Sequence, residues 1–117
     1  MPIDLANIIF RVEDGCLLMS AVARGGTPYR HACPLESFVL VAHELDAAGT
    51  DGITREQLHD RTKIPWTRIN VAITFLFERS IVDRSGRRGR LYVPTSGTVF
   101  EDAMLEYHAL RENGPTG

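Results

Sequence analysis

Long apolar runs are absent from this chain of 117 residues. No stretch approaches the roughly 20 consecutive apolar residues that a membrane-spanning helix requires. The first apolar run also lacks the basic start of a secretory signal and is interrupted by Arg11, Glu13 and Asp14. These absences predict a cytoplasmic protein with no membrane partner.

Cysteine is scarce and the common catalytic motifs are missing. Cys16 and Cys33 are too few for a disulfide framework, and the His-x-Cys spacing of His31 and Cys33 is not a recognised pair of metal ligands. The chain contains no glycine-rich phosphate loop and no HExxH, GxSxG or CxxC sequence, and its four histidines are scattered. The sequence therefore predicts a protein that is not an enzyme and has no cofactor and no metal.

Charge is unevenly divided along the chain. The net charge of −2 argues against a protein that coats nucleic acid indiscriminately. Residues 55–90 nevertheless hold nine basic and four acidic side chains, a local balance of +5, which leaves −7 for the remainder. A basic middle between acidic ends predicts one face that meets a polyanion and other surfaces that do not.

The densest basic segment is 84–90, which reads Arg-Ser-Gly-Arg-Arg-Gly-Arg. Glycine supplies the positive φ that tight turns need, and arginine supplies forked, charged donors suited to phosphate or a narrow minor groove. The segment follows a helix-like run and precedes the strand-like residues 91–93, which predicts a basic β-hairpin. A solvated loop that carries charge for solubility is the alternative.

A helix is predicted over residues 3–23, because apolar residues recur there at spacings of three and four: Leu5, Ile9, Val12, Cys16, Met19 and Ala23. Asp14-Gly15 is also a favourable two-residue hairpin turn, so a pair of strands, 8–13 with 16–21, is the alternative. The helix is preferred because the hairpin lacks clean alternation. A loop is expected from residue 25 to residue 33.

The middle of the chain predicts two closely spaced helices. Pro34 begins a helix over 35–48, and Thr54 and Gln57 form a capping box that starts a short helix ending near Thr62. A turn over 63–65 then leads to a helix that begins at Pro65 or the next residue and ends near residue 80. Two helices three or four residues apart, followed by a basic hairpin, predict a helix-turn-helix with a wing.

Four segments in this order resemble the winged-helix core of MarR-type (multiple-antibiotic-resistance regulator) transcription factors. They are 53–58 (Ile-Thr-Arg-Glu-Gln-Leu), 64–69 (Ile-Pro-Trp-Thr-Arg-Ile), 75–84 (Phe-Leu-Phe-Glu-Arg-Ser-Ile-Val-Asp-Arg) and 94–97 (Pro-Thr-Ser-Gly). Many winged-helix groups share these motifs. The resemblance implies a mostly α fold with a small β-hairpin wing in a single domain, 1–117, with a winged-helix core at 35–97 and dimerisation helices at 3–23 and 98–112. It also implies a homodimeric transcriptional regulator that binds specific double-stranded DNA.

Five residues depart from the family pattern. His59 stands where a small alanine usually lets the two motif helices approach, and Ser80 replaces the usual glycine. Val71 occupies a spot that is often basic or polar. Phe75 and Phe77 are apolar where exposed polar residues are common, so they belong either to the core or to a patch for a partner protein.

DNA binding in this fold places the helix from residue 66 in a major groove. Its first turns then present candidates for base contact, namely Thr67, Arg68, Asn70, Val71 and Thr74. Arg68 suits guanine, Asn70 suits adenine, and Val71 or a threonine methyl suits the methyl group of thymine. A surface ion pair for Arg68 and an ordinary polar surface position for Asn70 are the alternatives. Salt-sensitive affinity is expected from the wing arginines Arg84, Arg87, Arg88 and Arg90, and a phosphate contact from Thr54 and Arg55.

Dimerisation through paired terminal helices is what the resemblance implies for the chain ends. The predicted surface consists of Leu5, Ile9 and Val12 with Phe100, Met104 and Tyr107. A C-terminal helix packed only on its own core is the alternative. Two other functions remain open: a winged helix that binds protein instead of DNA, and a sensor with a small-molecule effector near Tyr29, His31 or Tyr107. Redox sensing by Cys16 or Cys33 resembles what some members of the family do.

Overall fold

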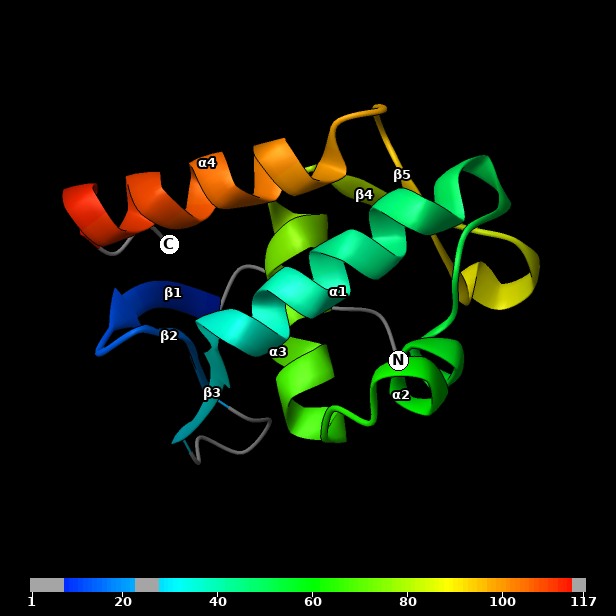
Figure 1. The fold of residues 1–117 in the computed structure, drawn as a ribbon. Helices are drawn as coiled ribbons and strands as arrows, with labels where there is room; N and C mark the ends of the chain where they lie inside the picture. Colours follow the sequence, from blue (N-terminus) through cyan, green and yellow to red (C-terminus); the bar gives the residue numbers. More distant parts are fainter. Residues whose placement is uncertain (1–7, 23–27, 115–117) are drawn as a thin grey trace.

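The computed structural model describes residues 8–22 and 28–114, and these form four α-helices and two small antiparallel sheets (Figure 1). In chain order the strands and helices are β1 (Ile8–Glu13), β2 (Cys16–Val22), β3 (Pro28–Pro34), α1 (Leu35–Ala48), α2 (Arg55–Thr62), α3 (Trp66–Glu78), β4 (Val82–Ser85), β5 (Leu91–Pro94) and α4 (Val99–Asn113). Two single 3-10 turns are η2 (Gly49–Asp51) and η3 (Arg87–Gly89). None of the helices in these ranges is long and apolar enough to cross a membrane.

The N-terminal region is a three-stranded sheet, so the prediction of a helix over 3–23 is wrong for the residues of that range that the structure describes. β1 and β2 pair antiparallel around Asp14 and Gly15, whose φ angles are 52° and 74°. Positive φ at both central residues is the conformation of a two-residue hairpin turn. β3 pairs with the other edge of β2, where a loop was expected. The Asp-Gly turn therefore outweighed the helical spacing of the apolar residues.

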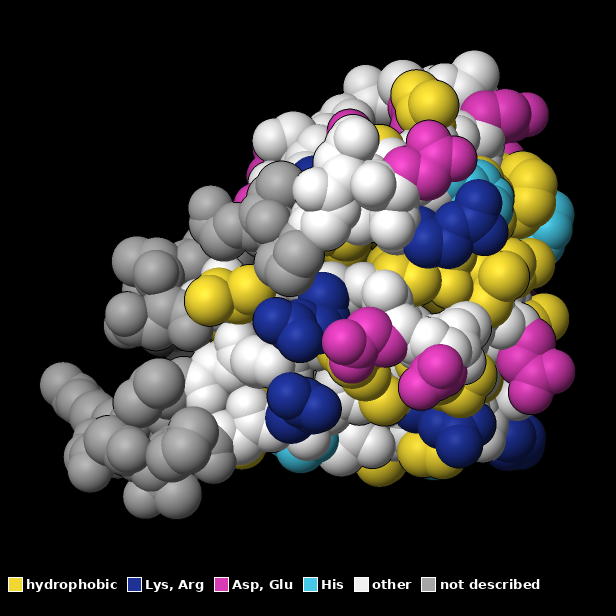
Figure 2. All heavy atoms as spheres, turned by 90° about the vertical axis from the view of Figure 1, so that its left-hand side faces the viewer, with side chains coloured by type: hydrophobic (Ala, Val, Ile, Leu, Met, Phe, Trp, Pro, Cys, Tyr) yellow, Lys and Arg dark blue, Asp and Glu magenta, His cyan; other side chains and the backbone are white. Residues whose placement is uncertain are grey.

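Apolar residues on both faces of this sheet explain why its alternation was hard to recognise. Phe10 and Leu17 point into the core, as strand alternation requires. Ile9 and Leu18 are also apolar but belong to the opposite face, where Ile9 is 47% exposed. The sheet lies on the left-hand side of Figure 1, and Figure 2 shows that this side carries hydrophobic side chains among charges of both signs.

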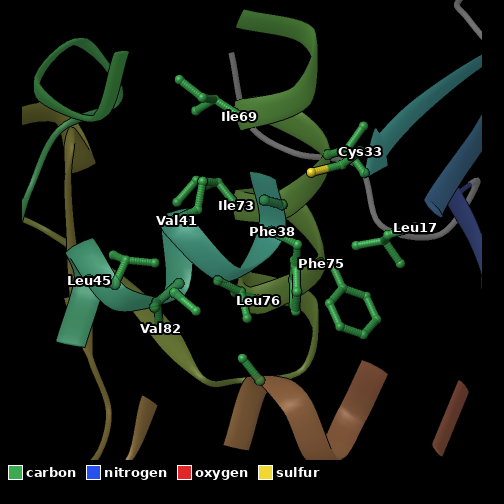
Figure 3. Packing of buried hydrophobic residues seen from close by; sticks show 14 of the residues in the cluster. Leu17, Cys33, Phe38, Val41, Leu45, Ile69, Ile73, Phe75, Leu76 and Val82 are labelled. Carbon is green, nitrogen blue, oxygen red and sulfur yellow. The ribbon is translucent and has the colours of Figure 1, made fainter. Parts of the chain in front are cut away.

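The core lies between the sheet and helices α1, α3 and α4. Phe75 of α3 contacts Phe10 of β1 and Phe38 of α1 edge to face, with ring centroids 5.2 and 5.8 Å apart. The ring of Phe38 also packs against that of Tyr107 of α4, with centroids 5.7 Å apart. Figure 3 shows how Leu17 of the sheet approaches the side chains of α1 and α3. Phe75 is thus a core residue, one of the two expectations for it, and Phe77 is half-buried against the same cluster.

The elements after residue 34 agree with the sequence prediction because local signals define their ends. Pro34 directly precedes α1, and the predicted capping box begins α2. The Thr54 hydroxyl accepts a hydrogen bond from the Gln57 backbone N–H at 3.1 Å, and the Gln57 side chain accepts one from the Thr54 N–H at 3.0 Å. This reciprocal pair satisfies two N–H groups that a helix start otherwise leaves open.

A short bridge joins the β4–β5 hairpin to the segment before α2. Ile53 and Tyr92 exchange backbone hydrogen bonds of 3.0 and 2.9 Å. Gly52 has a φ of 74°, and a Cβ at this position would lie 3.0 Å from Cγ2 of Val93 and 3.2 Å from the Tyr92 carbonyl oxygen. Only glycine fits this close approach without strain. The start of α2 is therefore held beside β5.

Candidate nucleic-acid interface

Backbone and side-chain hydrogen bonds hold the turn between α2 and α3. Lys63 ends α2 in the left-handed conformation with a φ of 61°, and its N–H donates to the His59 carbonyl at 2.8 Å. The Thr62 hydroxyl donates to the Leu58 carbonyl at 2.6 Å and accepts the Ile64 N–H at 3.2 Å. Pro65 then directly precedes α3. These bonds determine the direction in which α3 leaves the turn.

His59 stabilises the turn that its size seemed to obstruct. Its Nδ1 lies 2.9 Å from the carbonyl oxygen of Ile64, which only accepts, so Nδ1–H is the donor. The ring also stacks on Trp66, with centroids 4.2 Å apart and an interplanar angle of 20°. Trp66 remains 45% exposed. His59, in place of a small residue, thus provides a stacking partner for Trp66 at the start of α3.

α3 exposes only its first turns. Thr67 is exposed and Arg68 and Asn70 are half-buried, so three of the five predicted base-contacting residues reach the surface. Val71 and Thr74 are buried, at 0% and 5% exposure, and in this conformation they cannot reach a groove. The three-stranded sheet packs along α3. The sequence prediction put a separate helix in place of this sheet, and it therefore overestimated the free surface of α3.

The side chain of Arg68 lies near the buried thiol of Cys33. Burial raises the pKa of Cys33 to about 12, and the positive charge of Arg68 opposes this effect only in part. The thiol is therefore protonated near pH 7, which is its unreactive form. Cys16 is half-buried and belongs to the opposite face of the sheet. No group of His, Cys, Asp and Glu side chains suited to a metal ion occurs in the described part of the chain.

Thr54 and Arg55 lie at the start of α2, next to β5. The Thr54 hydroxyl and N–H both take part in the helix cap, which leaves the hydroxyl hydrogen to donate elsewhere. The Arg55 guanidinium lies over the ring of Tyr92, 5.5 Å from its centroid. Its Nε is buried and has no hydrogen-bond partner among the residues that the structure describes. Of the two predicted phosphate contacts, Arg55 thus has the greater free capacity to donate.

The turn of the β4–β5 hairpin is held from within by Arg84. The Arg84 Nε donates to the Gly89 carbonyl at 3.0 Å, and the guanidinium lies so close to Gly89 that a Cβ there would be 3.3 Å from Nε. Gly86, Arg88 and Gly89 all have positive φ, of 77°, 63° and 62°. The predicted wing residue Arg84 therefore supports the turn, and the other arginines of the segment form its outer surface.

Arg87, Arg88 and Arg90 are exposed and line an open hollow of about 350 Å³. None of the three has an acidic partner within the ranges described. The turn therefore presents three exposed guanidinium groups without counter-charges among the described residues. An arginine guanidinium is always charged and can bind two oxygens of one phosphate at the same time.

Arg79 shows that not every basic residue of the 55–90 segment contributes to this surface. Its side chain pairs with Glu78 at 2.8 Å, reaches Glu106 of α4 at 3.6 Å and lies over the ring of Phe75. It therefore joins α3 to α4. The free positive charge concentrates in the hairpin turn and in the exposed Arg61 and Lys63 near the end of α2.

The residues predicted for dimerisation do not form one helical surface. Leu5 lies outside the described residues, and Ile9 and Val12 belong to a strand. Phe100 and Met104 of α4 are half-buried against the core, and Phe100 stacks on His43 of α1 with centroids 4.2 Å apart. Tyr107 is 1% exposed and belongs to the core, so it is not available to a second copy in this conformation. The exposed leucines of the helices are Leu105 of α4, at 70%, and Leu40 of α1, at 48%.

The residues considered for a small-molecule pocket are split between two environments. Tyr29 and His31 of β3 lie ring to ring, with centroids 5.0 Å apart, and Tyr29 is exposed. Tyr107 instead packs against Phe38 in the core. The hollow described above is lined by arginines and by none of these rings.

Trp66, Arg61 and Lys63 are surface residues that the sequence pattern did not single out. Arg61 and Lys63 were counted in the basic segment, and Trp66 was recognised only as the start of a helix. The sequence did place Trp66 on the first turn of the helix, because it directly follows the proline that starts the helix. What was missing was the stacking partner, since His59 is seven residues away.

Comparison with known proteins gives no match to a protein family, to a curated protein or to a solved structure.

Proposed function

We propose that this chain is a non-enzymatic winged helix-turn-helix protein that binds double-stranded DNA and regulates transcription, as its resemblance to MarR-type regulators implies. The order α1, the Ile53 bridge, α2, α3 and the β4–β5 hairpin supports a winged-helix arrangement. The observation that carries the proposal is the hairpin turn with Arg87, Arg88 and Arg90 exposed and without acidic partners.

The proposal gives the two exposed regions different tasks. Arg87, Arg88 and Arg90 of the wing hold phosphates or enter the minor groove, which gives affinity for any sequence. Thr67, Arg68 and Asn70 on the first turns of α3 reach base edges in the major groove, where Arg68 suits guanine and Asn70 suits adenine. Arg55 adds a phosphate contact at the start of α2. Val71 and Thr74 are not part of the proposed interface because they are buried.

A homodimer is part of the same proposal, because two-fold symmetric proteins commonly read paired half-sites in DNA. The structure changes the residues that we assign to its surface. Leu105 and Leu40 replace Tyr107 and Val12, since the first pair is exposed and the second is buried or half-buried. We place this regulator in the cytoplasm.

The test is fluorescence anisotropy of a labelled random-sequence duplex at low salt, followed by a salt titration. The three phosphate contacts of the wing contribute about −2.7 to the slope of the logarithm of the binding constant against the logarithm of salt concentration. Replacing Arg87 and Arg88 by alanine should reduce the slope by about 1.8 and weaken binding to all sequences. Arg111→Ala is the matched control, because Arg111 is an exposed arginine near the end of α4. No binding at low salt, or an unchanged slope in the double variant, would contradict the proposal.

A protein-docking role without DNA binding is the second candidate. The strong exposure of Leu105 and the burial of most of α3 favour it, because both leave less groove-reading surface and more apolar surface than a DNA reader needs. The same titration separates the two functions. A protein-docking module should show no salt-dependent affinity for duplex DNA, and its binding to a partner should be insensitive to substitution of Arg87 and Arg88.

A further inference from the structure

Trp66 is an aromatic side chain that the fold holds at the surface in a defined orientation. It is 45% exposed on the first turn of α3. His59 supports it from α2 through a ring stack of 4.2 Å, and the hydrogen bond from Nδ1 of His59 to the Ile64 carbonyl orients the supporting ring. Pro65 restricts the backbone immediately before it. The ring is therefore pre-organised while it is still open to solvent.

The surroundings of Trp66 fit a polyanion better than an apolar protein partner. Lys63 and Arg61, three and five residues earlier, are exposed cations, and Thr67 beside it is an exposed hydroxyl. No acidic residue occurs between Arg61 and Phe77. A contact here therefore combines one aromatic surface with positive charge. Nucleic-acid-binding surfaces use this combination, because the aromatic ring contacts bases and the cations attract phosphates.

The chemistry of the major groove limits what an aromatic ring can contact there. Base edges in this groove present hydrogen-bond donors and acceptors, and their apolar group is the C5 methyl of thymine. Val71 or a threonine methyl was the predicted partner for this contact, but Val71 and Thr74 are buried in the core. Thr67 is exposed there, but the large apolar side chain exposed on the first turns of α3 is Trp66.

We infer that Trp66 is a base-reading residue that packs its free ring surface against the C5 methyl of thymine, and that His59 is the positioning residue that holds the ring. This inference rests on the proposed DNA binding and adds a sequence preference to it. Arg68 and Asn70 then read by hydrogen bonds, and Trp66 reads by apolar contact on the same turns of the helix.

Trp66 is the only tryptophan of the chain, so its intrinsic fluorescence reports this contact directly. The first experiment titrates a short duplex, isolated by in vitro selection with the full chain, and follows anisotropy of the labelled DNA together with tryptophan fluorescence. Binding by anisotropy should coincide with a change in Trp66 emission and with protection from quenching by acrylamide. Binding that leaves emission and acrylamide access unchanged overturns the inference and leaves the proposed function intact. Absence of binding by anisotropy overturns the proposed function and the inference with it.

The second experiment replaces each thymine of the selected duplex by deoxyuridine, which removes only the methyl group. At one position the wild type should lose about fourfold in affinity, the effect expected for one buried methyl group. Trp66→Ala should bind the thymine and deoxyuridine duplexes equally, while Trp66→Phe keeps part of the difference. Tyr29→Ala is the control that should keep all of it, because Tyr29 is an exposed aromatic beside a histidine ring on β3, outside the proposed interface. Equal discrimination in wild type and Trp66→Ala overturns the inference, and so does a selected site without thymine.

The role of His59 has its own readout. His59→Ala should retain the salt dependence that the wing arginines provide, but lose most of the discrimination between thymine and deoxyuridine because the ring of Trp66 is no longer held. In the His59→Ala variant without DNA, Trp66 should also be more accessible to acrylamide than in the wild type. Full discrimination with unchanged acrylamide access in His59→Ala shows that His59 does not position Trp66.

Discussion

Ser80 occupies a backbone conformation that favours glycine, and replacing it by glycine should stabilise the protein. Its φ is 61°, and it directly follows Arg79, the C-cap residue of α3. The Ser80 N–H donates to the Phe77 carbonyl at 3.0 Å, and the Ile81 N–H donates to the Leu76 carbonyl at 2.9 Å. This is the hydrogen-bond pattern of a Schellman motif, whose left-handed position is usually glycine.

The magnitude follows from two opposing effects. A left-handed conformation costs an L-residue about 1–2 kcal/mol, which glycine avoids. Glycine in turn adds about 0.5–1 kcal/mol of conformational entropy to the unfolded chain. The exposed Ser80 side chain makes no hydrogen bond that the substitution would remove, since only its carbonyl accepts one, from the Thr95 hydroxyl at 2.8 Å. Ser80→Gly should therefore raise the free energy of unfolding by about 0.7 kcal/mol and the Tm by about 3 °C.

The assay is urea unfolding followed by circular dichroism, with Ser85→Gly as the matched control. Ser85 is an exposed serine at the end of β4, and its φ is not positive. The same chemical change there should lower the free energy of unfolding by about 0.5–1 kcal/mol, because glycine only adds flexibility in a strand. Equal effects of the two substitutions, or destabilisation by Ser80→Gly, would refute the reasoning from backbone conformation.

Three further predictions concern the packing, the buried thiol and the surface. Gly52→Ala should destabilise the protein by about 1–3 kcal/mol in urea unfolding, because the new Cβ would approach Val93 and alanine would be strained at this positive φ. No loss of stability would contradict this close contact with β5. Because burial raises the pKa of Cys33 from 9.0 to about 12, its contribution to stability is complete below pH 9 and is lost as pH rises toward 12, by about 1.4 kcal/mol per pH unit. Comparing alkaline unfolding of wild type with Cys33→Ala isolates this effect, and equal pH profiles would contradict it. Leu105→Lys should convert the proposed homodimer to a monomer in sedimentation equilibrium with little change in Tm. The same mass for wild type and variant would contradict a dimer contact at Leu105.

The helices and the β4–β5 hairpin could be predicted from the sequence because their boundaries depend on nearby residues. The Thr54–Gln57 capping box, the turn at Lys63 and the glycines around Arg88 act over distances of a few residues. The hydrogen-bond partners in these caps and turns are a few residues apart in the sequence, so the sequence pattern alone reveals them. The bounds of α1, α2 and α3 therefore agree with expectation.

The N-terminal sheet could not be predicted with the same certainty because two local patterns conflicted. The apolar spacing at Ile9, Val12 and Cys16 fits a helix, and Asp14-Gly15 fits a hairpin. The hairpin formed, and a third strand, β3, whose residues carried no strand signal of their own, pairs with β2. Strand pairing is a property of distant segments, and only the folded chain brings them together.

The sequence by itself determined the turns, the helix caps and the concentration of arginine in the β4–β5 hairpin. The tertiary structure decided which of these side chains remain available. Val71 and Thr74 are buried among the elements that pack around α3, the Arg84 side chain turns inward to the Gly89 carbonyl, and the ring of Trp66 stacks on His59 while 45% exposed. The physical reason is that a cap or turn is satisfied by neighbours in the chain, whereas burial depends on every element that packs against a residue.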